Sequence, residues 1–188
     1  RRGRQWVSPY GSNLYLSLLW EFSQGAAALE GLSLAVGAAV ARALRTFGVP
    51  AVQLKWPNDI LCSGAKLGGI LLEMSGDAAG SCRVVIGIGL NVRPIAGIAA
   101  ALRGEGGNLP ALALDDLLDG RRLPRNALVA ALLDVLHGSL RSFGTTGARD
   151  FLAEWRQRDC LAGHLVVVTR GQESFTGLAC GLADDGSL

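Results

Sequence analysis

The alternation of residues 83–92 constrains the fold more than any other feature of the chain. The run reads Arg-Val-Val-Ile-Gly-Ile-Gly-Leu-Asn-Val, and every second residue would point to the same face of a β-strand. One face is apolar and consists of Val84, Ile86, Ile88 and Leu90. The other face contains Gly87 and Gly89, which leave a flat lane without side chains that ends at Asn91. Two interpretations are open: a ligand lies against this lane, or a helix packs closely over it.

The segment 53–73 has an unusual distribution of basic residues. Lys55 and Lys66 are the only lysines of the chain, and the other sixteen of its 18 basic residues are arginine. An ammonium group holds a phosphate or carboxylate oxygen as a point charge, whereas a guanidinium group acts as a planar fork. This choice of residue indicates an anion-binding role for the two lysines.

A β-hairpin is predicted around Pro57. Proline fixes its own φ and favours an extended residue before it, so a strand at 53–56 should end there, and residues 60–62 would form the return strand. This hairpin would present three polar side chains near one end, those of Lys55, Asn58 and Asp59.

Lys66 follows that hairpin and precedes Gly68 and Gly69, where bare backbone would let a ligand approach before a strand at 70–73. Two cations, an amide and a carboxylate in this arrangement predict a nucleotide and metal site. Residues 87–92 fail the G-x-G-x-x-G pattern because position 92 is valine, and the sequence contains no Walker pattern. Rossmann and P-loop nucleotide sites are therefore poor interpretations.

Periodicity predicts the remaining elements. Alternating leucines from Leu14 to Leu18 predict a strand within residues 6–19, and Asn126 is the expected cap of an amphipathic helix at 126–143. Residues 93–124 read as a surface connection with a short helix near 112–118. The other expected elements are helices at 30–47 and 148–158 and strands at 165–169 and 174–181.

Composition limits the class of protein. The chain has 188 residues, of which 49% are hydrophobic and 18% charged, so it should be globular. A net charge of +2 argues against nucleic acid as the main partner. The four cysteines lack C-x-x-C spacing, which favours reduced thiols over disulfides or zinc. Charged residues limit the apolar run at 29–44 to less than the length needed to span a membrane, and no signal peptide is visible. We therefore expect no membrane association and a cytoplasmic location.

Four short motifs resemble the catalytic domain of biotin protein ligases. They occur in the order RRGRQW at 1–6, KWPND at 55–59, KLGGIL at 66–71 and GIGLNV at 87–92. The resemblance implies an ATP-dependent ligase that forms biotinyl-5'-AMP from biotin and ATP and then transfers biotin to a lysine of a carboxylase biotin carrier domain. It also implies an α+β fold with a mixed β-sheet packed by helices, similar to class II aminoacyl-tRNA synthetases. The expected domains are a catalytic domain at 1–158 and a truncated SH3-like β-barrel at 159–188.

The resemblance also assigns roles to individual residues. The catalytic residues would be Lys55 and Arg1. Mg²⁺ would be supported by Asn58 and Asp59, and Lys66 would bind phosphate. The other residues expected to bind biotin or the adenylate are Arg2, Gly3, Arg4 and Trp6 in a loop over the ligand, Gly68, Gly69, Ile70 and Leu71 at the biotin pocket, and Gly87, Gly89 and Asn91 beneath the nucleotide.

The implied partners are the biotin carboxyl carrier domain, with a homodimer left open, and DNA only if a helix-turn-helix precedes this chain. The family's Ser-Thr-Asn biotin-binding segment is expected upstream of Arg1, so this chain alone is expected to be impaired. Two alternatives remain. A lipoate or octanoate ligase or transferase of the same superfamily would share the fold, and a nonenzymatic nucleic-acid-binding module would show strongly salt-dependent binding.

Overall fold

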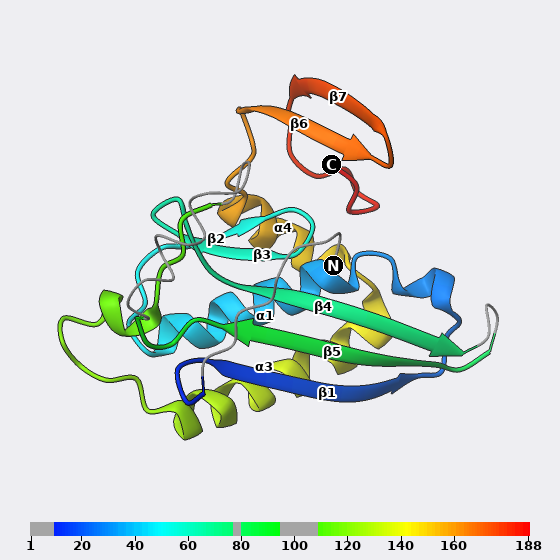
Figure 1. Ribbon diagram of the computed structural model, residues 1–188. Helices are drawn as coiled ribbons and strands as arrows, with labels where there is room; N and C mark the ends of the chain where they lie inside the picture. The colour runs from blue at the N-terminus through cyan, green and yellow to red at the C-terminus, as the bar shows by residue number, and fades with distance from the viewer. Residues whose placement is uncertain (1–9, 77–79, 95–108) are drawn as a thin grey trace.

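The main feature of the fold is a five-stranded sheet. The computed structural model describes residues 10–76, 80–94 and 109–188. The strands lie in the order β1-β5-β4-β3-β2 (Figure 1), with β1 at Leu14–Phe22, β2 at Val52–Lys55, β3 at Asp59–Cys62, β4 at Ala65–Gly76 and β5 at Cys82–Leu90.

Every pairing between these five strands is antiparallel, so the expected α+β class is confirmed but the expected mixed sheet is wrong for the described strands. The physical reason is connectivity: β2 to β5 follow one another through short connections, which join antiparallel strands. Parallel pairing among the described residues is limited to two isolated bridges, Leu54 with Asp159 and Lys66 with Ala111.

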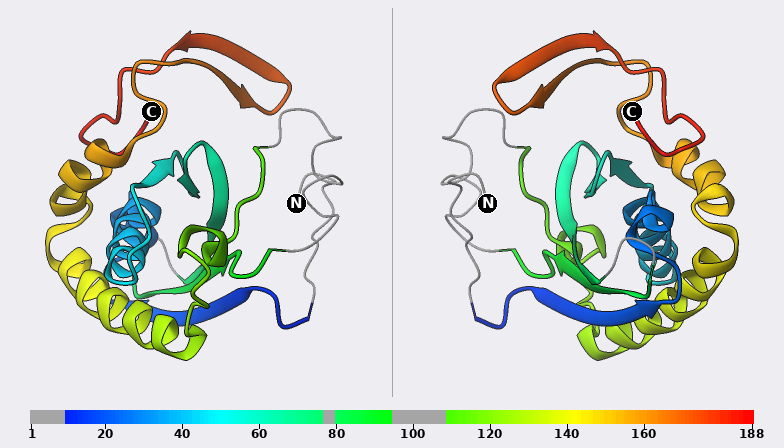
Figure 2. Two further views of the ribbon diagram at one scale, coloured as in Figure 1. Left: turned by 90° about the vertical axis from the view of Figure 1, so that its left-hand side faces the viewer. Right: turned by 90° about the vertical axis from the view of Figure 1, so that its right-hand side faces the viewer.

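Helices cover one side of the sheet (Figure 2). They are the 3-10 turn η1 at Ala26–Leu29, α1 at Leu32–Thr46, the 3-10 turn η3 at Leu114–Leu117, α3 at Arg125–Thr146 and α4 at Arg149–Arg158. Helix α1 packs against α3, α4 and the sheet. It is almost fully buried because small side chains dominate it, which lets its neighbours approach closely.

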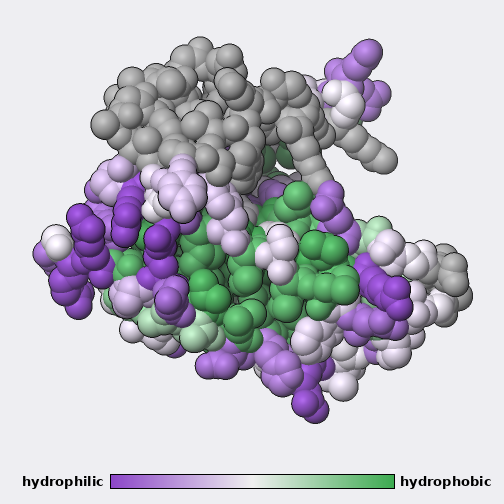
Figure 3. Space-filling model, turned by 60° about the horizontal axis from the view of Figure 1, so that its bottom comes forward, coloured by the Kyte–Doolittle hydropathy of each residue, from purple (hydrophilic) through white to green (hydrophobic). Residues whose placement is uncertain are grey.

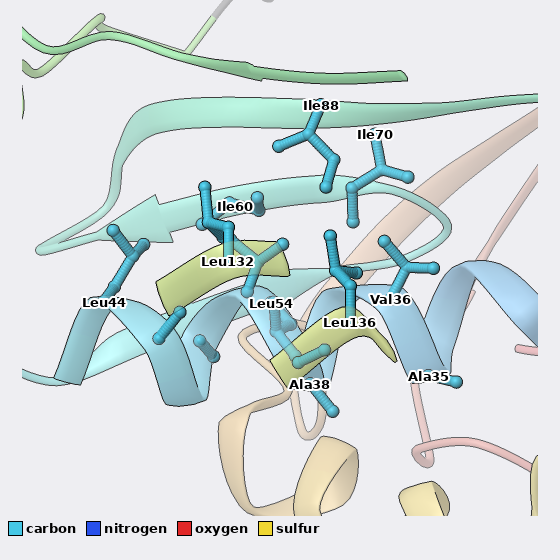
Figure 4. Packing of buried hydrophobic residues seen from close by; sticks show 14 of the residues in the cluster. Ala35, Val36, Ala38, Leu44, Leu54, Ile60, Ile70, Ile88, Leu132 and Leu136 are labelled. Atoms are coloured by element: carbon cyan, nitrogen blue, oxygen red, sulfur yellow. The ribbon is translucent and has the colours of Figure 1, made fainter. Parts of the chain in front are cut away.

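The core lies between α1 and the sheet. Ile60, Ile70 and Ile88 point from three strands towards Leu132 and Leu136 of α3 and the residues of α1 (Figure 4). The predicted apolar face of β5 is confirmed, because its four apolar members are at most 2% exposed. Gly37 lets α4 approach α1: a Cβ there would lie 2.6 Å from the ring of Trp155, which is completely buried.

Several predicted boundaries change. The first strand runs to Phe22, the first helix begins at Leu32, and β4 begins at Ala65 and so includes both neighbouring glycines. The predicted cap at Asn126 is wrong: α3 begins at Arg125, and the preceding Pro124 occupies the cap position without a side-chain hydrogen bond.

A separate two-stranded sheet follows α4. It consists of β6 at Leu165–Arg170 and β7 at Glu173–Leu178, and it stands away from the main sheet (Figure 1). The chain then returns to the main sheet and its helices, where Ala179 and Leu182 are buried. The described residues of this region form a hairpin and a docked loop.

Two helical stretches, 26–46 and 125–146, are long and apolar enough to cross a membrane by length and composition alone. The first stretch has 21 residues, so it is longer than the apolar run that the sequence predicted. However, 67% of its most apolar window is buried in the protein, as in an ordinary core helix. The second is 33% buried.

Figure 3 shows apolar residues gathered on the side of the molecule where β1 and α3 lie, bordered by polar ones. Leu19 of β1 and Leu133 of α3 are among the exposed apolar side chains.

Candidate functional site

A row of directly paired residues crosses the open face of the sheet. Lys55 of β2 pairs with Asp59 of β3, Asp59 with Gly69 of β4, Gly69 with Gly89 of β5, and Gly89 with Tyr15 of β1. Directly opposite residues in antiparallel strands share a face. The register therefore places a cation and a carboxylate at one end of a stretch that has no side chains.

The lane predicted from β5 is confirmed as an open face. Gly87 and Gly89 are half-buried, whereas Ile86, Ile88 and Leu90, which alternate with them, are buried. In the next row, Gly87 pairs with Leu71 of β4 and Ser17 of β1. Flat backbone bordered by the exposed side chain of Leu71 suits a ligand with an apolar part.

A β-bulge aims Lys66 at this row. The register between β3 and β4 shifts between Ile60 and Leu61, so that Ile60 pairs with Gly68 while Leu61 pairs with Lys66. Without the extra residue, period-two alternation would put Lys66 on the core face with Gly68 and Ile70. The bulge instead buries Leu67 and places the Lys66 ammonium beside Gly69 on the open face.

Lys66 forms an ion pair with Asp59. Its Nζ lies 2.5 Å from Asp59 Oδ1, and the two side chains are 41% and 24% exposed. By contrast, none of the described residues forms a hydrogen bond or ion pair with the Lys55 ammonium. The local charge is therefore positive, with one cation already paired and another available to an anion.

Two asparagines brace this site. Asn58 Nδ2 donates to the carbonyl of Ile70, and the Ile70 N–H donates to the carbonyl of Asn58, at 2.8 and 2.9 Å. Asn91 Nδ2 donates to the carbonyl of Lys66 at 3.2 Å, and its own N–H donates to Leu67. Asn58 thus fixes the hairpin turn, and Asn91 fixes the start of β4 near Lys66.

The neighbouring glycines of β4 differ in role. A Cβ on Gly68 would lie 2.2 Å from the carbonyl oxygen of Gly89, so close strand packing explains that glycine. A Cβ on Gly69 would lie 3.5 Å from Asp59 Oδ1 and 3.7 Å from Lys66 Nζ, at the site itself. Ile70 is buried, and Asn58 occupies both of its backbone polar groups. Of these three residues, only Gly69 faces the site.

The described residues do not fit a direct magnesium site as they stand. Lys66 already neutralises the carboxylate of Asp59, and the Nδ2 group of Asn58 donates to Ile70, which leaves the amide oxygen of Asn58 as a single neutral ligand. The described part of the chain also contains no cluster of three or more side chains of the His, Cys, Asp and Glu types that could hold a metal ion. We therefore assign Asp59 to the positioning of Lys66.

Cys160 lies beside the same hairpin. Burial raises the pKa of its thiol above the usual value, and Asp159 adds to this effect, while the positive charge of Lys55 opposes it. The thiol is therefore protonated at neutral pH and supplies no anion to the site.

The predicted residues Arg1, Arg2, Gly3, Arg4 and Trp6 lie outside the described residues. Sequence reasoning missed the bulge at Leu67, the ion pair between Lys66 and Asp59, and the bracing by Asn91. The sequence did contain a signal for the ion pair, because Asp59 and Lys66 lie on either side of a short predicted turn. The odd spacing between Lys66 and Gly69 hides the face that they share, since strict alternation along a strand would place them on opposite faces.

Replacing Asp59 tests its assignment as a positioning residue. Because the residues of this site predict nucleotide binding, we expect Asp59→Ala to raise the Kd for ATP about tenfold, equivalent to roughly 1.4 kcal/mol, since Lys66 loses its partner. The Mg²⁺ concentration for half-maximal ATP binding should stay unchanged, and Asp134→Ala on the exposed side of α3 is the control. A raised Mg²⁺ requirement in Asp59→Ala would instead make Asp59 a metal ligand.

Comparison with known proteins shows the family to which this chain belongs. A profile of the Biotin/lipoate A/B protein ligase family matches residues 1–91. The biotin--[acetyl-CoA-carboxylase] ligase of Paracoccus denitrificans is 33% identical over the whole chain, which covers 77% of that protein. The chain belongs to the biotin protein ligase family.

Further similarities extend over the whole chain. It is 36% identical to the bifunctional ligase/repressor BirA of Escherichia coli, of which it covers 56%. The chain therefore spans little more than half the length of such relatives. The structure resembles a biotin protein ligase from Aquifex aeolicus in complex with biotin and ATP, with a TM-score of 0.76 and 27% identity over 99% of this chain and 74% of that one.

Proposed function

We propose that this chain is the catalytic part of an ATP-dependent biotin protein ligase. The row from Lys55 through Asp59 and Gly69 to Gly89, with Lys66 beside it, carries the proposal. One end of the row binds anions, as the carboxylate of an acid and the phosphates of a nucleotide require. The flat lane beside it leaves room for the apolar body of the acid. Membership of the biotin protein ligase family supports biotin as the acid.

The reaction has two steps. A carboxylate oxygen of biotin attacks the α-phosphorus of ATP, and the bond from that phosphorus to the departing pyrophosphate oxygen breaks. A neutral amine of a carrier lysine then attacks the acyl carbon of biotinyl-5'-AMP. AMP leaves with the bridging oxygen and its electron pair, and the new amide loses its extra proton to solvent.

This chain's residues supply charge and position. Lys55 stabilises the negative charge shared by the carboxylate and the α-phosphoryl group, because its ammonium is not paired with any described residue. Lys66 binds a phosphate oxygen while Asp59 holds it beside Gly69. Gly69, Gly87 and Gly89 leave room for the ligand on the sheet.

The remaining assignments extend this proposal. Arg1, Arg2, Gly3, Arg4 and Trp6 cover the adenylate and exclude water from it. Leu71 contributes to the biotin pocket, and Asn91 lies near the nucleotide. Mg²⁺ would be bound together with ATP and would offset part of the negative charge of its phosphates.

The proposed organisation is a catalytic domain at 1–158, of the class II aminoacyl-tRNA-synthetase type, and an SH3-like domain that begins at 159. The acceptor is a carboxylase biotin carrier domain. A cytoplasmic location and a homodimer remain parts of the proposal.

The decisive experiment measures ATP–pyrophosphate exchange with biotin, lipoate or octanoate as the acid. It uses the full-length protein, since the chain spans 56% of its Escherichia coli relative. We expect exchange with biotin and little with the other acids. Exchange with lipoate or octanoate alone would change the substrate, and a folded protein without exchange would contradict adenylation altogether.

A further inference from the structure

The backbone on either side of Lys55 determines where its ammonium lies. Lys55 is the last residue of β2, and no described residue forms a hydrogen bond or ion pair with its side chain. Its neighbours Leu54 and Trp56 are both held by the part of the chain that follows α4, about a hundred residues later.

The first of these contacts involves Leu54. The N–H of Cys160 donates to the carbonyl of Leu54 at 3.1 Å, next to the parallel bridge between Leu54 and Asp159. Arg158 Nη1 also donates to the carbonyl of Val52, at 3.4 Å. The end of α4 therefore pairs with β2 along its free edge, where α4 and β2 lie next to each other in Figure 1.

The second contact involves Trp56. Its indole Nε1–H donates to the carbonyl of Gly186 at 3.1 Å, across 130 positions of sequence. Trp56 is half-buried against the core. An indole N–H that is partly removed from water needs an acceptor, so this bond fixes the orientation of the ring and of the turn that follows Lys55.

The loop that supplies this carbonyl is itself anchored. Arg156 donates through Nε and Nη2 to the carbonyl of Leu182, at 3.2 and 2.9 Å, and through Nη2 to Asp184. The side chain of Leu182 is only 6% exposed. The loop is therefore attached to α4, the same helix whose end pairs with β2.

At the far end of the loop, the backbone approaches helix α1 so closely that only glycine fits. Gly186 has a φ of +83°, and a Cβ there would lie 2.8 Å from Cδ1 of the buried Leu34 on α1. Both the left-handed backbone and the contact would be disturbed by any side chain. A substitution at Gly186 should therefore move its carbonyl away from Trp56.

We propose that residues 158–186 position Lys55 by holding Leu54 through the N–H of Cys160 and Trp56 through the carbonyl of Gly186. The region after α4 thereby contributes to adenylation without touching the reactants. The catalytic role of Lys55 in this inference rests on the proposed function. The contacts that hold Leu54 and Trp56, and thereby position Lys55, do not depend on that role.

The test uses Gly186→Ala, which should displace the acceptor carbonyl, and Trp56→Phe, which removes the indole donor. Gly120→Ala is the matched control for the first, since Gly120 lies outside this segment and has a similar φ of +79° with no atom within 4 Å of the added Cβ. Trp20→Phe is the control for the second, since Trp20 lies on β1. Circular dichroism checks that each variant is folded.

The first readout is the NMR spectrum of the chain after reductive ¹³C-methylation. Lys55 and Lys66 are its only lysines, so two side-chain signals are expected and Lys55→Arg assigns them. We expect Gly186→Ala and Trp56→Phe to shift the Lys55 signal, with Lys66 and both control variants unchanged. An unmoved Lys55 signal in both folded variants would overturn the proposal.

The second readout is biotin-dependent exchange in the full-length protein. Misplacing Lys55 should lower kcat about tenfold while leaving KM for ATP nearly unchanged. A fall in exchange for the control variants equal to that of Gly186→Ala would show only a general structural effect and would count against positioning. If the Lys55 signal moves but the unmodified protein shows no exchange with any acid, the proposed function fails while the positioning of Lys55 stands.

Discussion

Lys55→Ala is expected to lower biotin-dependent ATP–pyrophosphate exchange by about 100- to 1,000-fold, the usual cost of removing one well-placed group that stabilises transition-state charge. The change removes the ammonium at the end of the cross-strand row without breaking an ion pair between described residues, because Asp59 is already paired with Lys66. Most of the loss should appear in kcat, since the negative charge on the phosphoryl oxygens is greatest during the adenylation step.

The control for this prediction is Lys55→Arg, which keeps the positive charge. A guanidinium group is planar and larger than an ammonium group, so we expect the exchange rate of Lys55→Arg to lie between those of the unmodified protein and Lys55→Ala. Thermal unfolding should change little in either variant, because Lys55 is half-exposed at the end of β2. A folded Lys55→Ala enzyme that retains full exchange would remove Lys55 from the reaction.

The sequence predicted the open lane correctly because its signal is local. Alternating apolar residues and glycines in β5 determine the two faces of that strand without reference to any other element. The hairpin at Pro57 was predicted for the same reason, since proline restricts its own residue and the one before it.

The arrangement around Lys66 could not be predicted in this way. A single extra residue at Leu67 reverses the faces of β4, and only the pairing with β3 reveals it. The bond from Trp56 to Gly186 likewise depends on how two distant segments pack. Local patterns therefore give the residue types of the site, whereas tertiary pairing decides which of them face the ligand.

Gly68→Ala should lower the free energy of unfolding by about 3 kcal/mol, the upper part of the range for overpacked interiors. The added Cβ would lie 2.2 Å from the carbonyl oxygen of Gly89 and 2.8 Å from Cδ2 of Leu90. The first of these atoms belongs to the backbone of β5, so relief requires the separation of two central strands. Urea denaturation should show a lower midpoint with an unchanged slope.

Gly69→Ala is the matched control, because it makes the same change one residue along the strand on the opposite face. Its Cβ would meet its nearest atoms at 3.5 to 3.7 Å, which is ordinary contact, so stability should change by less than about 1 kcal/mol. The methyl group would instead stand in the lane beside Asp59 and Lys66 and raise KM for biotin or ATP. The two glycines should thus separate the stability of the sheet from ligand binding. Equal losses of stability in both variants would contradict the assignment of Gly68 to the core face and of Gly69 to the site.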